Sequence, residues 1–452
     1  WSLDLPATPL DALGPLARRL HLGPRGTIGV VLGARQTATR LELDFDLTVE
    51  GVTFDHPSVA SAPIPDIHAR IEGRLIFDAT AQELSVRDLV VRSGQLAVTG
   101  ELDLVSAFGA PRIRLSLDLP ETALSDVVAG IPVGLIPLLS GLRMDGRLAW
   151  QLSIDLDTTD PAAVKVESRP NATGVRVLSL GDRLDLSALR TAHTYTIRLF
   201  DGTPGTRVVG PATASWVPLS QITPYLPLAL TTTEDGTFYT NDGISTFAMR
   251  ESIATNLERG SFVRGASTIT QQLVKNLFLG GDKTVSRKLQ EVFIAWQLAQ
   301  LLSKDEIMAL YLNTIEFGPG IYGIGDASWH WFGKRPLDLT LAEAVFLASI
   351  VPGPRRYYTF YEQGGITPRW VSYLEALMKV MVERKKITAE ELAMNLPVQV
   401  RFRGHGGGYT DEVPADFDLV PERDGLNDPE LPLRDPELPL RDPAPEPTEE
   451  DP

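Results

Sequence analysis

Apolar and polar residues alternate along much of the first half of the chain, and this period of two constrains the fold more than any other feature. In residues 41–49, Leu, Phe or Val stands at every odd position and Glu, Asp or Thr at every even one. Successive side chains of a strand point to opposite faces of a sheet, so the pattern predicts a strand with one apolar face. Further runs are Ile71–Phe77, Leu96–Leu104, Ile113–Leu119 and Leu148–Leu156. The sequence therefore predicts a long antiparallel sheet, in which Gly73 and Gly100 mark points where strands bulge or curve.

An apolar sheet face of this length needs a cover. Residues 122–139 are apolar and interrupted by Pro132 and Pro137, which predicts short helices across an end or edge of the sheet. Two arrangements stay open: a sandwich or helix-capped sheet, and a curved open sheet. The second is considered because residues 1–190 resemble the repeated-strand regions of AsmA-like and TamB-like envelope proteins, whose curved sheets hold lipid chains. That resemblance rests on the alternating strands and Gly-x-Leu turns.

Near Val217 the apolar period changes from two to 3.6, which indicates helices. The pairs Ser303 with Glu306 and Thr388 with Glu391 have capping-box spacing and predict two helix starts. The expected fold is α+β and multidomain, with an antiparallel β-rich domain followed by a mainly α-helical domain. The predicted boundaries are a β-rich domain at 1–190, a connection with one strand and a Gly-rich segment at 191–212, a helical domain at 213–400 and a tail at 401–452.

The net charge of −16 comes mostly from the tail, because residues 411–452 hold 15 acidic residues and 3 Arg. With many prolines and few aromatic residues the tail is predicted to be disordered. The rest of the chain is close to neutral, which excludes a basic nucleic-acid-binding face. The absence of Cys excludes a disulfide framework, and the 6 His have no ligand-like spacing, so no metal site is predicted. No run approaches the ~20 apolar residues of a spanning helix, and a membrane anchor is expected upstream of Trp1.

Polar residues of the helical half fall into blocks. Thr268 and Gln271 have capping-box spacing, and the helix they open would present its amides and Lys275 to an anion such as a pyrophosphate. On a later helix, Arg287 and Lys288 reach the same face as Glu291. This trio suits either a surface ion-pair ladder or a site for a diphosphate. The opposite face of that helix is expected to be core, with Val285, Leu289, Val292, Phe293 and Trp296.

In order, the blocks Thr233-Glu234-Asp235-Gly236-Thr237-Phe238-Tyr239, Gly265–Gln272, Arg287–Glu291 and Tyr311-Leu312-Asn313 resemble those of the peptidoglycan glycosyltransferase domain (glycosyltransferase family 51), the polymerase half of class A penicillin-binding proteins. The resemblance implies a lysozyme-like fold that polymerises lipid II into β-1,4 glycan strands with inversion and releases undecaprenyl diphosphate. It implies Glu234 as the general base for the acceptor 4-hydroxyl and Glu291 as a second catalytic carboxylate. The residues expected to bind substrate are Asp235, Ser267, Thr268, Gln271, Gln272, Lys275, Arg287, Lys288 and Asn313, with backbone capping as a further role for Asp235.

The same resemblance sets expectations about partners and location. It requires no cofactor but leaves open a divalent cation, Mg²⁺ or Mn²⁺, near Glu291. The expected partners are lipid II, the growing glycan strand, the membrane surface and a separate transpeptidase, because Ser-x-x-Lys and Lys-Thr-Gly motifs are absent. The expected location is the bacterial cell envelope, at the periplasmic face of the inner membrane. A helix at 245–258, the loop at Phe262 and Val263, and Leu277–Leu279 would form a membrane-dipping lip that admits the lipid tail.

Two residues depart from the family pattern. Asn241 stands where the family usually has His, and Ala309 stands where it usually has Glu. These departures motivate one alternative, a catalytically attenuated envelope protein that handles lipid. The other alternative is a lysozyme-like hydrolase that cuts glycan, since such a fold with a catalytic Glu can run either reaction.

Overall fold

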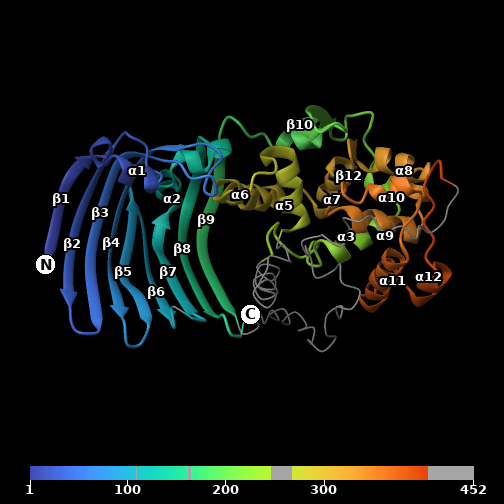
Figure 1. Ribbon diagram of the computed structural model, residues 1–452. Coiled ribbons are helices and arrows are strands. Elements are labelled where there is room, and N and C mark those ends of the chain that lie inside the picture. The colour runs from blue at the N-terminus through green and yellow to red at the C-terminus, as the bar shows by residue number, and fades with distance from the viewer. Residues whose placement is uncertain (108, 161–163, 246–266, 406–452) are drawn as a thin grey trace, which may run out of the picture.

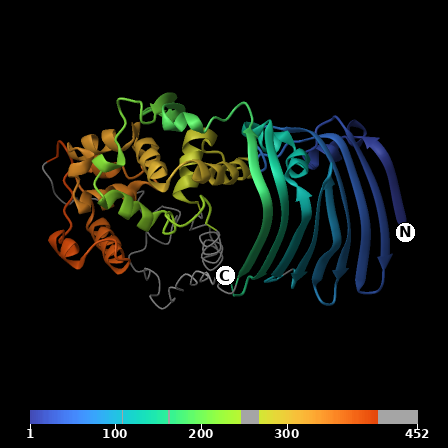
Figure 2. The same cartoon turned by 180° about the vertical axis from the view of Figure 1, so that it is seen from behind.

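The structure is a computed structural model that describes residues 1–107, 109–160, 164–245 and 267–405. A broad curved sheet forms the N-terminal part, and a bundle of helices follows it beyond strand β9 (Figure 1). The view from behind shows the same side-by-side arrangement (Figure 2). The predicted lip residues 246–258, Phe262 and Val263, and nearly all of the predicted tail, lie outside the described residues.

The sheet has nine antiparallel strands in sequence order, each paired with the strand that precedes it. This meander confirms the predicted β-rich domain followed by helices. Its strands are β1 (Ser2–Pro9), β2 (Thr27–Gln36), β3 (Arg40–Phe54), β4 (Ile64–Asp78), β5 (Glu83–Ser93), β6 (Leu96–Val105), β7 (Arg112–Ala123), β8 (Leu142–Asp157) and β9 (Lys165–Leu180).

The strand register separates an apolar face from a charged face, as the alternation predicts. One apolar row crosses six strands through directly paired residues: Leu43, Leu75, Val86, Leu102, Leu115 and Ile154. The other face carries cross-strand ion pairs, such as Arg70 with Asp46 at 2.6 Å and Arg112 with Asp155 at 2.7 Å. Each such pair joins side chains on two adjacent strands that are partly exposed to solvent. A surface ion pair contributes little to the free energy of unfolding, so these pairs mainly favour the observed strand register.

Short helices cover one end of the apolar face. Helix α1 (Pro15–Arg19) and the 3-10 helix η1 (Leu10–Leu13) bury Leu10 and Ala17 in a small core with Ile28 and Val52. Helix α2 (Leu124–Gly130) packs against β6, β7 and β8. The predicted helical cover at 122–139 is therefore confirmed. Among the described residues, the other sheets are two-stranded, and neither lies over this face.

Gly73 lies at a β-bulge, as predicted. The register between β4 and β5 shifts between Glu72 and Arg74. A Cβ atom at Gly73 would lie 2.8 Å from the Phe45 ring, so only glycine leaves room for this ring on the apolar face. Gly100 on β6 pairs with Leu89 on β5. A second register shift lies directly beside this pair, between Val86 and Leu89 of β5.

The connection to the helical part is a hairpin rather than the single strand predicted. Strand β10 (His193–Arg198) pairs with β11 (Pro204–Val209). The prediction of a loop after residue 200 was wrong because its glycines suggested irregular backbone, whereas Gly205 is an ordinary ladder residue opposite Ile197.

The helical part surrounds α9, in which every residue is buried. Its sequence is apolar on all sides, as a central helix requires, and its buried Glu343 is paired with Lys334 at 2.8 Å. The capping boxes predicted at Ser303 and Thr388 are confirmed. The helices are α3 (Tyr225–Thr233), α5 (Ile269–Val274), α6 (Val285–Leu301), α7 (Lys304–Thr314), α8 (Ile324–Phe332), α9 (Leu341–Ile350), α10 (Thr359–Gln363), α11 (Pro368–Glu383) and α12 (Ala389–Met394), with the short strands β12 (Glu316–Gly318) and β13 (Ile321–Tyr322) between them.

The orientation of α6 differs from the prediction. Val285 and Leu289, expected in the core, are 52% and 48% exposed. The buried side instead includes Ser286, Gln290 and Ile294. The apolar period alone does not identify which face of a helix meets its neighbours, and here the polar side chains at the start of α6 meet loops of the N-terminal domain.

Candidate active site

Glu234 and Asp235 follow α3, with Glu234 as its C-terminal cap. Asp235 is buried, and its carboxylate accepts hydrogen bonds from the backbone N–H of Ile269 at 3.2 Å and from Asn241 Nδ2 at 3.1 Å. Ile269 is the first residue of α5, so this carboxylate already fills the positive end of that helix. The capping role expected for Asp235 is thus present. A protein carboxylate thus accepts from the first N–H of α5, at the helix end where the sequence predicted a pyrophosphate, and this contact does not support that prediction.

Thr268 and Gln271 form the predicted capping box. Both are buried, and the Thr268 hydroxyl also donates to the Gly243 carbonyl at 2.7 Å. This placement does not support the substrate contacts expected of the two residues. Their side chains instead hold α5 against the segment that follows Glu234.

Gln272 joins Glu234 to Tyr311. Its Nε2 donates to Glu234 Oε2 at 2.8 Å, and its Oε1 accepts from the Tyr311 hydroxyl at 2.8 Å. Burial holds the pKa of Tyr311 well above its usual range, and the charges of Glu234 and Asp235 raise it further. Tyr311 therefore stays protonated and fixes the amide so that its N–H₂ group faces the carboxylate.

Lys275 lies where α5 passes into a π-helical turn, η7 (Lys275–Leu279), closed by a bond from Gly280 N–H to Lys275 O of 2.9 Å. Such turns often occur at functional sites. Burial lowers the pKa of the Lys275 ammonium. Glu291 and Glu234 act in the opposite direction, while Arg287 and Lys288 add to the lowering. Lys275 thus lies within electrostatic reach of both predicted catalytic carboxylates.

Glu291 is 2% exposed and is held between two cations of its own helix. Arg287 pairs with its Oε2, and Lys288 Nζ lies 2.5 Å from its Oε1. Lys288 also donates to Ser267 Oγ at 3.0 Å, which brings the segment before α5 to the same cluster. The predicted convergence of these three side chains on one face of the helix is confirmed. The three cations Lys275, Arg287 and Lys288 exceed the charge of Glu291, which suits a site for an anionic group.

The cluster does not fit a divalent cation. Both Glu291 oxygens are engaged by cationic side chains. Among the described residues, no group of three or more His, Asp or Glu side chains is placed to hold a metal ion.

Asn313 lies away from this cluster. Its Oδ1 accepts from Val217 N–H at 2.9 Å, and its Nδ2 donates to the carbonyls of Val217 and Ala309, each at 2.8 Å. These contacts fasten the chain entering the helical part onto α7. They do not support the predicted contact of Asn313 with substrate.

Sequence reasoning missed a second network, around Asn241. Its Nδ2 donates to Asp235, and its Oδ1 accepts from Lys304 Nζ at 3.1 Å. Lys304 also lies over the Phe238 ring, 4.8 Å from its centroid. Lys304 is 63 residues from Asn241 in sequence, so no local spacing links the two residues. The one sequence signal for this network was that Asn241 departs from the family pattern.

The predicted lip segment Leu277–Leu279 packs onto the protein. Leu277 is buried, and the Phe278 ring lies 4.8 Å from the ring of His193 on β10. The Phe278 side chain therefore faces the hairpin, and this arrangement does not support the predicted insertion of Leu277 and Phe278 into a membrane.

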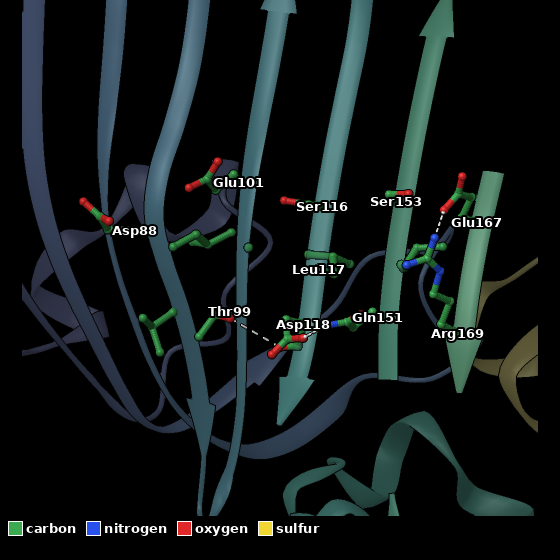
Figure 3. Close-up of a pocket in the computed structure, with 14 residues that line it drawn as sticks. Asp88, Thr99, Glu101, Ser116, Leu117, Asp118, Gln151, Ser153, Glu167 and Arg169 are labelled. Atoms are coloured by element: carbon green, nitrogen blue, oxygen red, sulfur yellow. Dashed lines mark hydrogen bonds and ion pairs between the residues drawn. The ribbon is translucent and has the colours of Figure 1, made fainter. Parts of the chain in front are cut away.

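A broad hollow on the sheet contains none of the predicted site residues. It has a volume of about 600 Å³ and lies on the charged face of the sheet, over β5 to β9 (Figure 3). Small side chains such as Ser116 and Ser153 leave the space, and the charged groups beside it pair with one another, as in Glu167 with Arg169 at 2.6 Å. It contains no catalytic cluster comparable to that around Lys275.

The helical part is similar to known proteins. Residues 201–378 match the transglycosylase family. A biosynthetic peptidoglycan transglycosylase of Nitrosospira multiformis is 41% identical over 157 residues, covering 35% of this chain and 66% of that protein. Penicillin-binding protein 2D of Bacillus subtilis is 41% identical over 178 residues, 39% of this chain and 26% of its own. Penicillin-binding protein 1A of Aquifex aeolicus is 37% identical over 188 residues, which cover 41% of this chain and 25% of that protein.

The chain thus spans between about a quarter and just under two thirds of these relatives. The matched region includes Glu234, the α5 block, the cationic cluster and α7.

In the described part of the chain, no helix is both long and apolar enough to cross a membrane.

Proposed function

We propose that this chain, whose residues 201–378 match the transglycosylase family, is a peptidoglycan glycosyltransferase of the bacterial cell envelope. Its substrate would be lipid II and its product a β-1,4 glycan strand. The observation that carries the proposal is the buried Glu291, which pairs with Arg287 and lies 2.5 Å from Lys288 Nζ, so that two cations converge on one face of α6. The charges of both Glu291 and Glu234 also act on the Lys275 ammonium.

In the proposed reaction, the acceptor 4-hydroxyl oxygen attacks the anomeric carbon of the donor sugar. Glu234 takes the hydroxyl proton, while Gln272 holds its carboxylate in place. The bond from the anomeric carbon to the diphosphate oxygen breaks, and undecaprenyl diphosphate leaves with the bonding electrons. Lys275, Arg287 and Lys288 would stabilise the charge of this leaving group. Glu291 would keep Arg287 and Lys288 oriented.

The test is polymerisation of labelled lipid II by the wild type and by Glu234→Gln. General-base catalysis typically contributes about 10²–10⁴-fold, so we expect a loss of that size with an unchanged melting temperature. Glu291→Gln should also be impaired, yet its remaining activity should keep the acidic limb of the pH–rate profile, which Glu234→Gln should lose. Full activity of Glu234→Gln would exclude this mechanism.

Two further assays of the same purified protein distinguish this function from the two alternatives, a glycan hydrolase and an attenuated lipid-handling protein. Release of soluble muropeptides from purified sacculi would indicate a hydrolase. Binding of lipid without polymerisation by the wild type would indicate an attenuated protein, as Asn241 and Ala309 suggest. A separate transpeptidase and a periplasmic location at the inner membrane remain part of the proposal.

A further inference from the structure

The helix that carries the cationic cluster is capped by the N-terminal domain. The first N–H groups of a helix have no partner within it and need one from outside. In α6 the N–H of Val285 donates to the Ser58 carbonyl at 3.1 Å, and that of Ser286 donates to the Val59 carbonyl at 2.8 Å. Both carbonyls belong to the loop between β3 and β4 of the sheet. The chain next to the helix supplies a side-chain cap of its own, in which the Arg287 N–H donates to Thr284 Oγ1 at 3.1 Å.

A second loop of the sheet domain holds the buried side of the same turn. The segment between α2 and β8 offers the Leu135 carbonyl to Ser286 Oγ at 2.9 Å, and its Leu138 N–H donates to Gln290 Oε1 at 2.7 Å. Ser286 and Gln290 are 5% and 4% exposed. Both hydrogen bonds are partly buried. Removing one partner would leave the other polar group unsatisfied, and this cost favours a rearrangement of the turn.

The far end of α6 has a similar contact. Arg190, which follows the sheet, donates to the Leu301 carbonyl at 2.7 Å. A cation at a helix C-terminus is favourable because it meets the negative end of the helix. Groups from residues 1–190 therefore contact both ends of the helix, and Figure 1 shows α6 directly beside the sheet.

We infer that the N-terminal sheet domain positions the anion-binding residues of the transferase site through Ser286 and Gln290. Arg287, Lys288 and Glu291 lie on the first two turns of α6, between and beside the two clamped residues. Glu234 follows α3, a different helix. Loosening the clamp should therefore weaken the binding of a diphosphate more than it slows the proton transfer. Ser286 and Gln290 are positioning residues, and the inference rests on the proposed function of this site.

The experiment uses the full chain with Ser286→Ala and Gln290→Leu. Ser286→Thr, which keeps the hydroxyl, serves as the rescue variant, and Gln300→Leu, at an exposed position of the same helix, is the matched control. Hydrogen exchange of the Val285–Arg287 amides is followed by mass spectrometry. Affinity for a fluorescent polyprenyl diphosphate in detergent micelles is measured by anisotropy, and KM and kcat for lipid II are measured in parallel.

We expect faster exchange at Val285–Arg287, about tenfold weaker binding of the probe and a rise in KM that exceeds any fall in kcat. The control and rescue variants should match the wild type. Unchanged exchange would overturn the clamp, and faster exchange with unchanged probe affinity would overturn its coupling to the site. A wild type that binds the probe but polymerises nothing would count against the proposed function alone, since exchange and affinity would still test this inference.

Discussion

The amide of Gln272 holds the carboxylate of Glu234, with a distance of 2.8 Å between Nε2 and Oε2. Its orientation depends on a third residue, since the Tyr311 hydroxyl donates to Gln272 Oε1, also at 2.8 Å. A flipped amide would turn an oxygen toward the carboxylate and be repelled. The proposed base is therefore held by a chain of hydrogen bonds that ends in a buried phenol.

We predict that Gln272→Met moves the acidic limb of the kcat/KM profile to higher pH. A hydrogen bond to a carboxylate favours its charged form, so losing one makes protonation easier. A bond to a charged group is worth about 1.5–3 kcal/mol, which corresponds to a shift of roughly one to two pH units. Tyr311→Phe should move the limb in the same direction by less, because Gln272 remains. Profiles that coincide with the wild type would show that this contact does not act on the base.

We predict that Lys275 limits substrate capture at alkaline pH. Burial lowers its pKa, so the free enzyme loses this positive charge at a lower pH than an ordinary lysine would. Below that pKa the ammonium is charged and attracts the diphosphate, and above it kcat/KM should fall. Lys275→Arg should remove this basic limb, because a guanidinium stays charged. Lys275→Met should lose about one to two orders of magnitude in kcat/KM, whereas the exposed Lys283→Met should lose little.

We predict that Lys386→Met stabilises the protein near neutral pH. Burial lowers the pKa of Lys386 to about 8, against 10.5 for the free side chain. Below pH 8 the folded protein keeps a desolvated charge, which opposes folding. Between about 8 and 10.5 the folded form releases a proton that the unfolded chain retains, so stability from this group rises with pH.

In urea unfolding at pH 7, Lys386→Met should gain about 1 kcal/mol, a figure reduced for the partial exposure of this lysine and for the loss of its hydrogen bond to Thr231 Oγ1. The gain should shrink as the pH approaches 10.5. Lys379→Met, at an exposed position of α11, is the control. A gain that does not change with pH would mean that packing, and not the charge, is responsible.

We predict that Ala309→Glu is tolerated. Ala309 lines a hollow of about 490 Å³ together with Arg190, Trp216 and Leu310. The hollow has room for the longer side chain, and the Arg190 guanidinium supplies an opposite charge next to the two carboxylates, Asp305 and Glu306, that also line it. The melting temperature should therefore change by only a few degrees. The matched variant Ala344→Glu, in the wholly buried helix α9, should fail to fold or melt far lower, because a buried charge without a partner is costly. Similar losses in both variants would contradict this reading of the hollow.

Local patterns in the sequence predicted much of the fold. The alternation at Leu43 and Phe45 predicted the strand and its apolar face, and the pairs Thr268 with Gln271 and Ser303 with Glu306 predicted helix starts. The spacing of Arg287, Lys288 and Glu291 predicted their meeting. These predictions succeed because a strand period, a capping box and an i,i+4 pair each depend only on residues a few positions apart in the sequence.

Other features depended on contacts between distant parts of the chain. The sequence predicted an anion site at the start of α5, but the fold brings Asp235 there across 34 residues. It predicted a buried Val285 and Leu289, but the loops at Ser58 and Leu135 bury the opposite side of α6. The link from Tyr311 through Gln272 to Glu234 joins two helices and the end of a third. The sequence by itself determined most of the segments that form strands and helices, though not strand β11. Only tertiary packing decided which face of each is buried and which partners fill its polar groups, because that depends on distant residues brought together.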